Sequence, residues 1–349
     1  MNKIYLYFSA IALFMLLNGC GKEDPNQGGV DQADWRLPIS LIFDGGPGKD
    51  GIPSVDDPKY TKANEVSFLL DSDLVDVFID GDEMVAYPHD ILDWHEIVND
   101  KVGGQAVTVT YCPLTGTGIA WDRVVNGVET TFGVSGLLYN TNLMPYDRSS
   151  NSTWSQIRQD CVNGELVDSK AEQLPLLEMK FSDLRQYYPN ADVVNEFTGF
   201  DRAYGSYPYG DYLTNNDRLI FPVTNQDDRL PKKERVLAIP SDSTAYIVSF
   251  DALDSNENVI VTNMADKTVL IFGDKQRNYI NAIEISSNDA DSFIYSSAGY
   301  PNVLLHEDGR TFDIFGRSTD GGEDLTIANN YIGYYFSFPA FFDEVIIVE

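Results

Sequence analysis

The chain contains few cysteines, histidines and basic residues. Of its 349 residues three are Cys and three are His, and 24 Lys and Arg stand against 54 Asp and Glu, which gives a formal net charge of −30. So few cysteines exclude a fold held together by several disulfides. The negative charge repels phosphate backbones, so we expect no nucleic-acid partner. After residue 17 the sequence contains no apolar run long enough to span a bilayer.

The N-terminal segment predicts export rather than a folded element. Lys3 precedes an apolar stretch, 4–17, which is too short and wrongly flanked for a membrane-spanning helix. The stretch ends in Leu17-Asn18-Gly19-Cys20, which resembles a bacterial lipobox. The resemblance implies that residues 1–19 are a signal peptide and that the thiol of Cys20 carries lipid. We therefore expect a protein of the bacterial cell envelope, held at the outer membrane by this lipid anchor.

Residues 20–38 are predicted to form a flexible tether, because the segment 21–34 is rich in Gly, Asn, Gln and Asp. Within it, Lys22-Glu23-Asp24 resembles the signals that send some bacterial lipoproteins to the outer surface of the cell. The remainder of the chain is long enough for one large domain or two smaller ones.

The rest of the sequence favours β structure. Segments with alternating apolar and polar residues recur and are separated by turn residues, and Asn126-Gly127 is typical of a two-residue hairpin turn. Helical periodicity is sparse, and the best candidates are 89–99 and 181–188. We predict a mainly β, β-rich α+β protein of antiparallel sheets in a sandwich or barrel-like arrangement with a few short helices.

A weak internal duplication divides the chain into a first half, 39–225, and a second half, 226–349. The pattern around Ala86 recurs around Ala245, which lies 159 positions later (245 − 86). On this alignment the counterpart of Cys112 falls near Phe272 or Gly273, so the cysteine is not repeated. We infer a scaffold used twice, with chemistry or binding kept in the first copy.

The strongest candidate for a reactive group is Cys112. It ends a β-patterned run, 107–111, and precedes Pro113, and a thiolate is an effective nucleophile near neutral pH. The alternative is a buried cysteine that behaves as a small hydrophobic residue. Cys161 lies in a turn-like segment and is interpreted as incidental, although it could pair with or resolve Cys112.

Several ordered motifs resemble the family called domain of unknown function 3179, from about residue 40 to the C-terminus. The matching stretches are 49–58, 86–88 with 94–100, 109–114, 132–140, 144–148, 153–156 and 230–236. The family brings no established activity. Many of its members carry a second cysteine or a selenocysteine three positions after the first, where this chain has Thr115. The resemblance thus implies redox chemistry in the family and leaves this chain without a resolving thiol at that position.

Other side chains are candidates for tuning Cys112 or shaping its pocket. His95 and Arg148 are predicted to adjust the charge of the thiol, because a thiol needs a nearby cation to ionise. A metal held by His95, Glu96 and Cys112 is conceivable, but we expect no metal and no other cofactor. The aromatic loop 204–212 could cover a pocket or stack on sugars. The predicted pocket residues are Glu96, Thr115, Ser135, Asn140, Trp154 and Gln156.

Two functions from different classes follow. The first is a lipid-anchored protein with a thiol-centred site of the oxidoreductase type. The second is a non-catalytic binding or scaffold module at the cell surface, in which the same residues form a buried polar network. Loss of a cysteine at Thr115 favours the second function.

Overall fold

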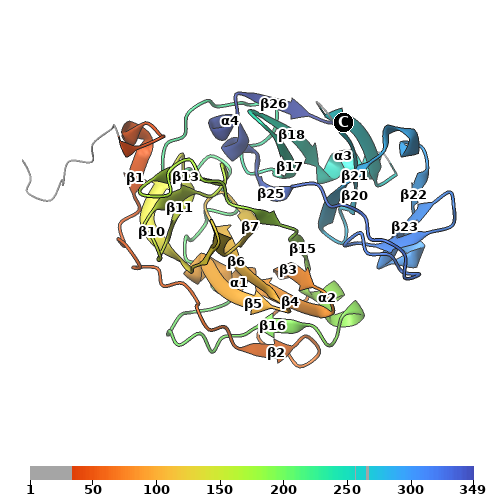
Figure 1. Ribbon diagram of the computed structural model, residues 1–349, viewed down its shortest axis with the longest axis horizontal. Helices are drawn as coiled ribbons and strands as arrows, with labels where there is room; N and C mark the ends of the chain where they lie inside the picture. The colour runs from red at the N-terminus through yellow and green to blue at the C-terminus, as the bar shows by residue number, and fades with distance from the viewer. Residues whose placement is uncertain (1–33, 256, 265–266) are drawn as a thin grey trace, which may run out of the picture.

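The computed structural model describes residues 34–255, 257–264 and 267–349, and most of its regular structure is β-strand (Figure 1). The predicted fold class is confirmed: several antiparallel sheets are joined by short helices, and none of the sheets built from the described residues closes into a barrel. None of the described helices has the length and apolarity needed to cross a membrane. The predicted signal peptide and Cys20 lie outside the described residues.

The described residues of the first half form two five-stranded sheets, one four-stranded sheet and one two-stranded sheet. Its elements are η2 Ile39–Leu41, β1 Ile42–Asp44, β2 Tyr60–Lys62, β3 Leu74–Asp80, β4 Glu83–Pro88, α1 His89–His95, β5 Ile97–Val102, β6 Gln105–Cys112, β7 Thr117–Asp122, β8 Val124–Val125, β9 Val128–Glu129, β10 Phe132–Tyr139, β11 Asn142–Asp147, β12 Thr153–Ser155, β13 Asp160–Asn163, β14 Gln173–Leu174, β15 Leu177–Lys180, α2 Phe181–Tyr187 and β16 Asp192–Val194.

The second half follows a long connection, 195–234, that contains neither helix nor strand. Its elements are β17 Arg235–Ser241, β18 Thr244–Ser249, α3 Phe250–Ser255, β19 Val259–Met264, β20 Lys267–Asp274, β21 Tyr279–Ile285, η3 Ser287–Asp289, β22 Phe293–Tyr295, η4 Ser297–Gly299, β23 Asn302–His306, β24 Thr311–Asp313, β25 Tyr331–Tyr334, η5 Tyr335–Ser337, α4 Phe338–Phe341 and β26 Glu344–Ile347.

The two halves repeat one topology. The sheet order β15-β3-β4-β16 in the first half matches β25-β17-β18-β26 in the second, with the last strand of each order parallel to its neighbour. A helix and an antiparallel meander then follow in each half: α1 with β5-β6-β7, and α3 with β19-β20-β21. Figure 1 places the two copies beside each other.

The strand pairing corrects the alignment of the two copies. In the first hairpin Asp80 pairs with Glu83, and in its counterpart Ser241 pairs with Thr244, so equivalent positions differ by 161 (241 − 80) rather than 159. In the following meander Val102 pairs with Gln105 and Met264 with Lys267, an offset of 162 (264 − 102). The counterpart of Cys112 is therefore Asp274, the last residue of β20.

Local predictions were met in part. Asn126 and Gly127 have positive φ and join β8 to β9, which confirms the predicted hairpin turn. The helix predicted over 89–99 was too long. It ends at His95, because Glu96 adopts the left-handed conformation, and the chain continues as strand β5.

The last residues of the predicted tether belong to the folded body. Leu37 is 3% exposed and packs in a small cluster with Met144 and Val162. Arg36 forms an ion pair with Asp168, and its backbone N–H donates to the carbonyl of Val162. Leu37, near the end of the predicted tether, is thus buried, which is favourable for an apolar side chain that can reach a hydrophobic cluster.

Candidate functional site

Cys112 ends β6 in the interior of the first half. The residue is 1% exposed, and its thiol points toward the carbonyl of Thr141 at 3.7 Å. Burial, followed by the negative charge of Glu96, raises the pKa of the thiol to about 11, although a hydrogen bond from Thr115 opposes the shift. The resting thiol is therefore protonated at neutral pH, the reverse of the predicted activation.

Glu96 is the ionisable group that accompanies this thiol. Burial raises the pKa of its carboxyl to about 7, and its backbone φ of 58° is unusual for a residue with a side chain. A strained, buried acid of this kind is common at functional sites.

The aromatic loop 204–212 covers Cys112 and Glu96. The hydroxyl of Tyr207 donates to the carbonyl of Pro113, and that of Tyr212 donates to the carbonyl of Leu114. A third hydrogen bond holds the loop in place: the hydroxyl of Tyr209 donates to the carboxyl of Glu96. The loop belongs to the irregular segment 195–234, and loops this long inside compact domains are commonly functional lids.

His95 and Arg148 do not act on the thiol. Burial lowers the pKa of His95, whose neutral ring donates from Nδ1 to the carbonyl of Pro53 at 2.7 Å and accepts at Nε2 from Tyr204 at 2.6 Å. Arg148 forms ion pairs with Asp50 and Asp56 in a separate cluster. Both side chains use their polar atoms on neighbours other than Cys112, so the predicted constellation is not brought together.

Thr115 and Gln156, predicted to line a pocket, are part of one buried network. Gln156 donates from Nε2 to the carbonyls of Thr110 and Thr117, and its Oε1 accepts from Thr117 and from Asn142. The Asn142 amide also donates to the hydroxyl of Thr115. These contacts join β6, β7 and β11, so the side chains position strands.

The remaining predicted pocket residues also have structural partners. The Trp154 indole donates to Asp147 at 3.1 Å, and the hydroxyl of Ser135 donates to the carbonyl of Met144. Asn140 donates to the carbonyl of Ala340 in the second half and accepts from Thr224 in the connecting segment. Trp154 and Ser135 therefore join neighbouring strands of one sheet, and Asn140 joins parts of the chain that lie far apart in sequence.

Cys112 and Cys161 are both buried and both carry free thiols. Cys161 donates to the carbonyls of Thr153 and Asn163, each at 3.4 Å, and burial raises its pKa to about 11. Pairing between the two cysteines does not occur in this structure.

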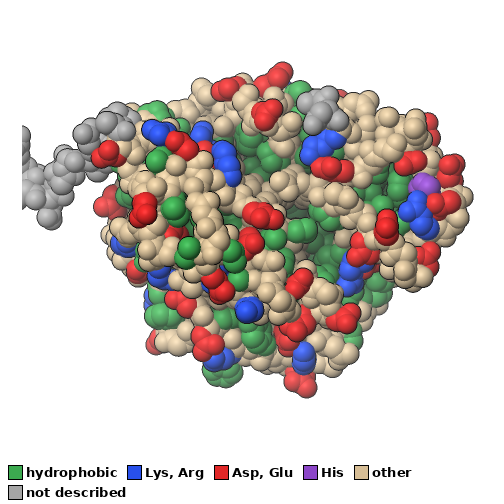
Figure 2. Space-filling model, viewed as in Figure 1, with side chains coloured by type: hydrophobic (Ala, Val, Ile, Leu, Met, Phe, Trp, Pro, Cys, Tyr) green, Lys and Arg blue, Asp and Glu red, His purple; other side chains and the backbone are tan. Residues whose placement is uncertain are grey.

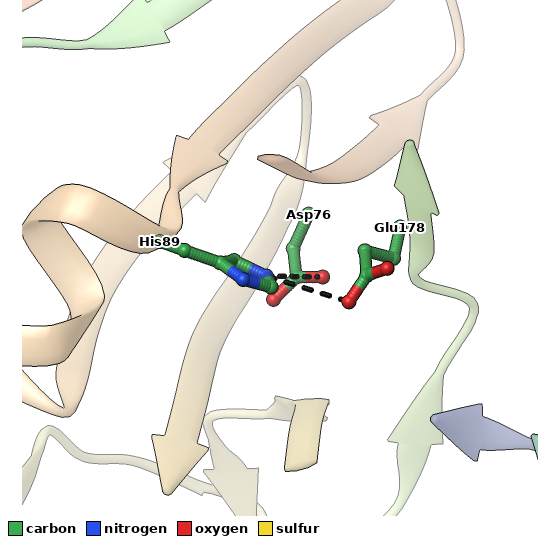
Figure 3. A group of neighbouring side chains, drawn as sticks. All are labelled: Asp76, His89 and Glu178. Atoms are coloured by element: carbon green, nitrogen blue, oxygen red, sulfur yellow. Dashed lines mark ion pairs between the residues drawn. The ribbon is translucent and has the colours of Figure 1, made fainter. Parts of the chain in front are cut away.

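A second polar site joins three residues that the sequence analysis did not group. Asp76 of β3, His89 at the start of α1 and Glu178 of β15 point toward one another (Figure 3). His89 Nε2 lies 3.4 Å from Asp76 Oδ1 and 3.7 Å from Glu178 Oε2, and the Tyr111 ring packs on the imidazole with centroids 4.5 Å apart. Asp76 and Glu178 are cross-strand neighbours, which explains why they meet despite their distance in sequence.

The environment of this site favours protonated groups. Burial by itself lowers the pKa of His89, but the negative charges of Asp76 and Glu178 outweigh it and raise that pKa. Burial raises the pKa of the nearby Asp93 to about 7. Few sequence signals could have revealed the site. His89 directly follows a strand that ends in Pro88, but its partners Asp76 and Glu178 come from two other strands.

Comparison with known proteins supports the family resemblance. No curated protein and no solved structure matches the chain. The family model described as "Protein of unknown function (DUF3179)" matches residues 49–345, which include both halves and every site described above. The chain belongs to the DUF3179 family.

Proposed function

We propose that this protein is a lipid-anchored protein of the bacterial envelope whose first half carries a thiol site, closed at rest by loop 204–212 and acting as a thiol-dependent oxidoreductase. The observation that carries the proposal is the burial of Cys112 beside the acid Glu96, beneath a loop that three tyrosine hydroxyls fasten in place. Opening of the loop would return water to the thiol and lower its pKa.

The proposed reaction is thiol–disulfide exchange with a small disulfide. The proton of Cys112 passes to the Glu96 carboxylate, and the thiolate attacks one sulfur of the substrate. A new S–S bond forms while the substrate S–S bond breaks, and the leaving thiolate takes the proton from Glu96. Cys112 ends as a mixed disulfide, and half of the substrate leaves as a thiol. Because residue 115 is Thr115, an external thiol must release the enzyme.

A non-catalytic binding module is the second candidate. It is favoured by the thiol pKa of about 11 and by the absence, among the described partners of His95 and Arg148, of any contact with Cys112. In that function Cys112 is a core residue. A ligand would then occupy another part of the surface, such as the hollow between the halves, which has a volume of about 250 Å³ and lies between β3 and β21 (Figure 2).

The two functions differ in what a disulfide does to the folded protein. We would incubate the full chain with glutathione disulfide and locate modified cysteines by peptide mass spectrometry. The oxidoreductase proposal predicts a mixed disulfide at Cys112 that dithiothreitol removes, and predicts that Cys161→Ser leaves the modification unchanged. If Cys112 is modified only after denaturation in urea, the binding module is the better account.

A further inference from the structure

The cluster of Asp76, His89 and Glu178 has the spacing of ligands around an ion. The three ligand atoms lie within 4.8 Å of one another, yet the His89 distances of 3.4 and 3.7 Å are longer than good hydrogen bonds. Two ligands at 2.0–2.1 Å from a tetrahedral zinc ion lie about 3.4 Å apart. His89 forms loose ion pairs with both carboxylates (Figure 3), and the three ligand atoms are close enough together for one ion to contact all of them.

Asp76 supplies an independent sign of a missing partner. The residue is 3% exposed, and its Oδ2 atom has no hydrogen-bond partner, as is also true of His89 Nε2. A cavity of about 10 Å³, the size of one water molecule, is lined by Asp76, Glu178 and Gly118. A side chain at position 118 would put its Cβ 2.4 Å from Asp76 Oδ2, so glycine there keeps the carboxylate in place.

The second half shows that the fold does not need these polar groups. By the strand registers, Asp76 corresponds to Leu237 and its cross-strand neighbour Glu178 corresponds to Ile332. His89, which begins α1, corresponds to Phe250, which begins α3. Three hydrocarbon side chains serve the same positions in the other copy, and such replacements commonly stabilise a protein interior. The second copy thus builds the same fold without this polar trio.

With His89 neutral, as an imidazole ligand must be, the remaining charges of the site sum to one negative charge and favour a cation. Asp76 and Glu178 bring two negative charges, and Arg235 brings one positive charge through its ion pair with Glu178. Asn278 donates to the other oxygen of Glu178 at 2.9 Å. Asn278 thus orients the carboxylate from outside, as supporting residues do around ligating carboxylates, whereas Arg235 contacts the oxygen that faces His89. Both come from the second half, so the site joins the two copies.

We propose that Asp76, His89 and Glu178 form a site for one divalent transition-metal ion, with zinc as the best match to one imidazole and two carboxylates. The small cavity beside Gly118 would hold a water molecule as a further ligand. Arg235 also contacts Glu178 Oε2. The metal ion would therefore either bind this oxygen together with Arg235 or bind it after the Arg235 side chain has moved away. The site is separate from Cys112 and does not depend on the function proposed for it.

The proposal is tested by zinc titration of the full, metal-stripped chain by calorimetry, with metal content measured by mass spectrometry. We expect one zinc per chain, and an affinity lowered about 100-fold by His89→Gln or by Asp76→Asn. Asp160→Asn is the matched control: it alters a buried carboxylate paired with Arg158 and should leave the zinc affinity unchanged. Saturating zinc should raise the melting temperature of the wild type and of the control.

X-ray absorption of the zinc-loaded wild type keeps the test independent of whether the variants fold. It should report one imidazole nitrogen with oxygen ligands at about 2.0–2.2 Å and no sulfur. The proposal is overturned if the wild type binds no stoichiometric zinc, if the variants bind as the wild type does, or if the spectrum contains sulfur ligands. In those cases Asp76, His89 and Glu178 are a buried ion cluster in which a proton on His89 takes the place of the metal ion.

Discussion

The hydroxyl of Tyr209 donates a 3.3 Å hydrogen bond to Glu96 Oε1, which links the aromatic loop directly to the acid beside Cys112. Burial raises the pKa of Glu96 to about 7, and this hydrogen bond opposes the shift. A single contact thus ties the cover of the site to the group that would receive the thiol proton. The state of the loop and the protonation of Glu96 should change together.

Glu96 should make the stability of the protein depend on pH. Its folded pKa of about 7 lies above the ordinary value of 4.5, so its protonated form stabilises the fold fully below pH 4.5, and this contribution is lost as pH rises through about 7. The loss amounts to about 3 kcal/mol at most. Urea unfolding should therefore show Glu96→Gln gaining stability relative to the wild type between pH 5 and pH 8.

A matched control for this change is Glu65→Gln, at an exposed position. Its unfolding free energy should follow that of the wild type at both pH values. If Glu96→Gln also follows the wild type at both values, the carboxyl of Glu96 is hydrated and the site is more open than we describe.

Gln156 should be important for stability through its hydrogen bonds. Replacement by Leu leaves the carbonyls of Thr110 and Thr117 and the amide of Asn142 without this partner in the interior. We expect a loss of about 2–4 kcal/mol in the free energy of unfolding, measured by chemical denaturation. Gln276→Leu, at an exposed position, should change it by less than about 0.5 kcal/mol. Equal effects of the two changes would argue against a buried network.

The β-rich class and the duplication could be predicted because alternation and turn residues are local signals. The turn at Asn126-Gly127 is one example, since both residues accept positive φ. The end of α1 could not be predicted in this way, because Glu96 adopts a left-handed conformation that favours glycine and is held there by tertiary contacts. The alignment of Ala86 with Ala245 was wrong by two positions. Sequence similarity alone does not show which residues pair in each hairpin, and the pairing fixes the equivalent positions.

The candidate site was harder to predict than the fold. Cys112 and Glu96 do meet, but sequence spacing could not indicate that a loop from 204–212 seals them and raises the thiol pKa. The trio of Asp76, His89 and Glu178 depends on the pairing of β15 with β3, two strands far apart in sequence. Only the strand registers reveal that the second half replaces all three with hydrocarbon side chains.

Arg148 should affect stability without affecting the thiol. Removal of its guanidinium by Arg148→Ala breaks ion pairs with Asp50 and Asp56 and a bond to Ser54, with a cost of about 1–3 kcal/mol. Under conditions where the protein stays folded, iodoacetamide should label Cys112 at the wild-type rate. Slower or faster labelling would indicate that Arg148 does tune the thiol, as first predicted.

An exposed pair provides the comparison for Arg148. Arg185→Ala removes a surface ion pair with Asp71 and should cost less than about 1 kcal/mol. It should likewise leave the labelling of Cys112 unchanged, because the pair lies outside the loop and the β6 region.

The most direct measurement is the iodoacetamide labelling rate of Cys112 in a double variant, Tyr207→Phe with Tyr212→Phe. The change removes two hydroxyl bonds that fasten the loop to Pro113 and Leu114 and keeps both rings. At two hydrogen bonds of about 1 kcal/mol each, we predict labelling at least about tenfold faster than in the wild type at pH 8. Tyr331→Phe, which removes a buried hydroxyl from the carbonyl of Ile157, should cause no such increase. If Cys112 is labelled in all three proteins only at their rates of global unfolding, the loop is not a lid and Cys112 is a core residue.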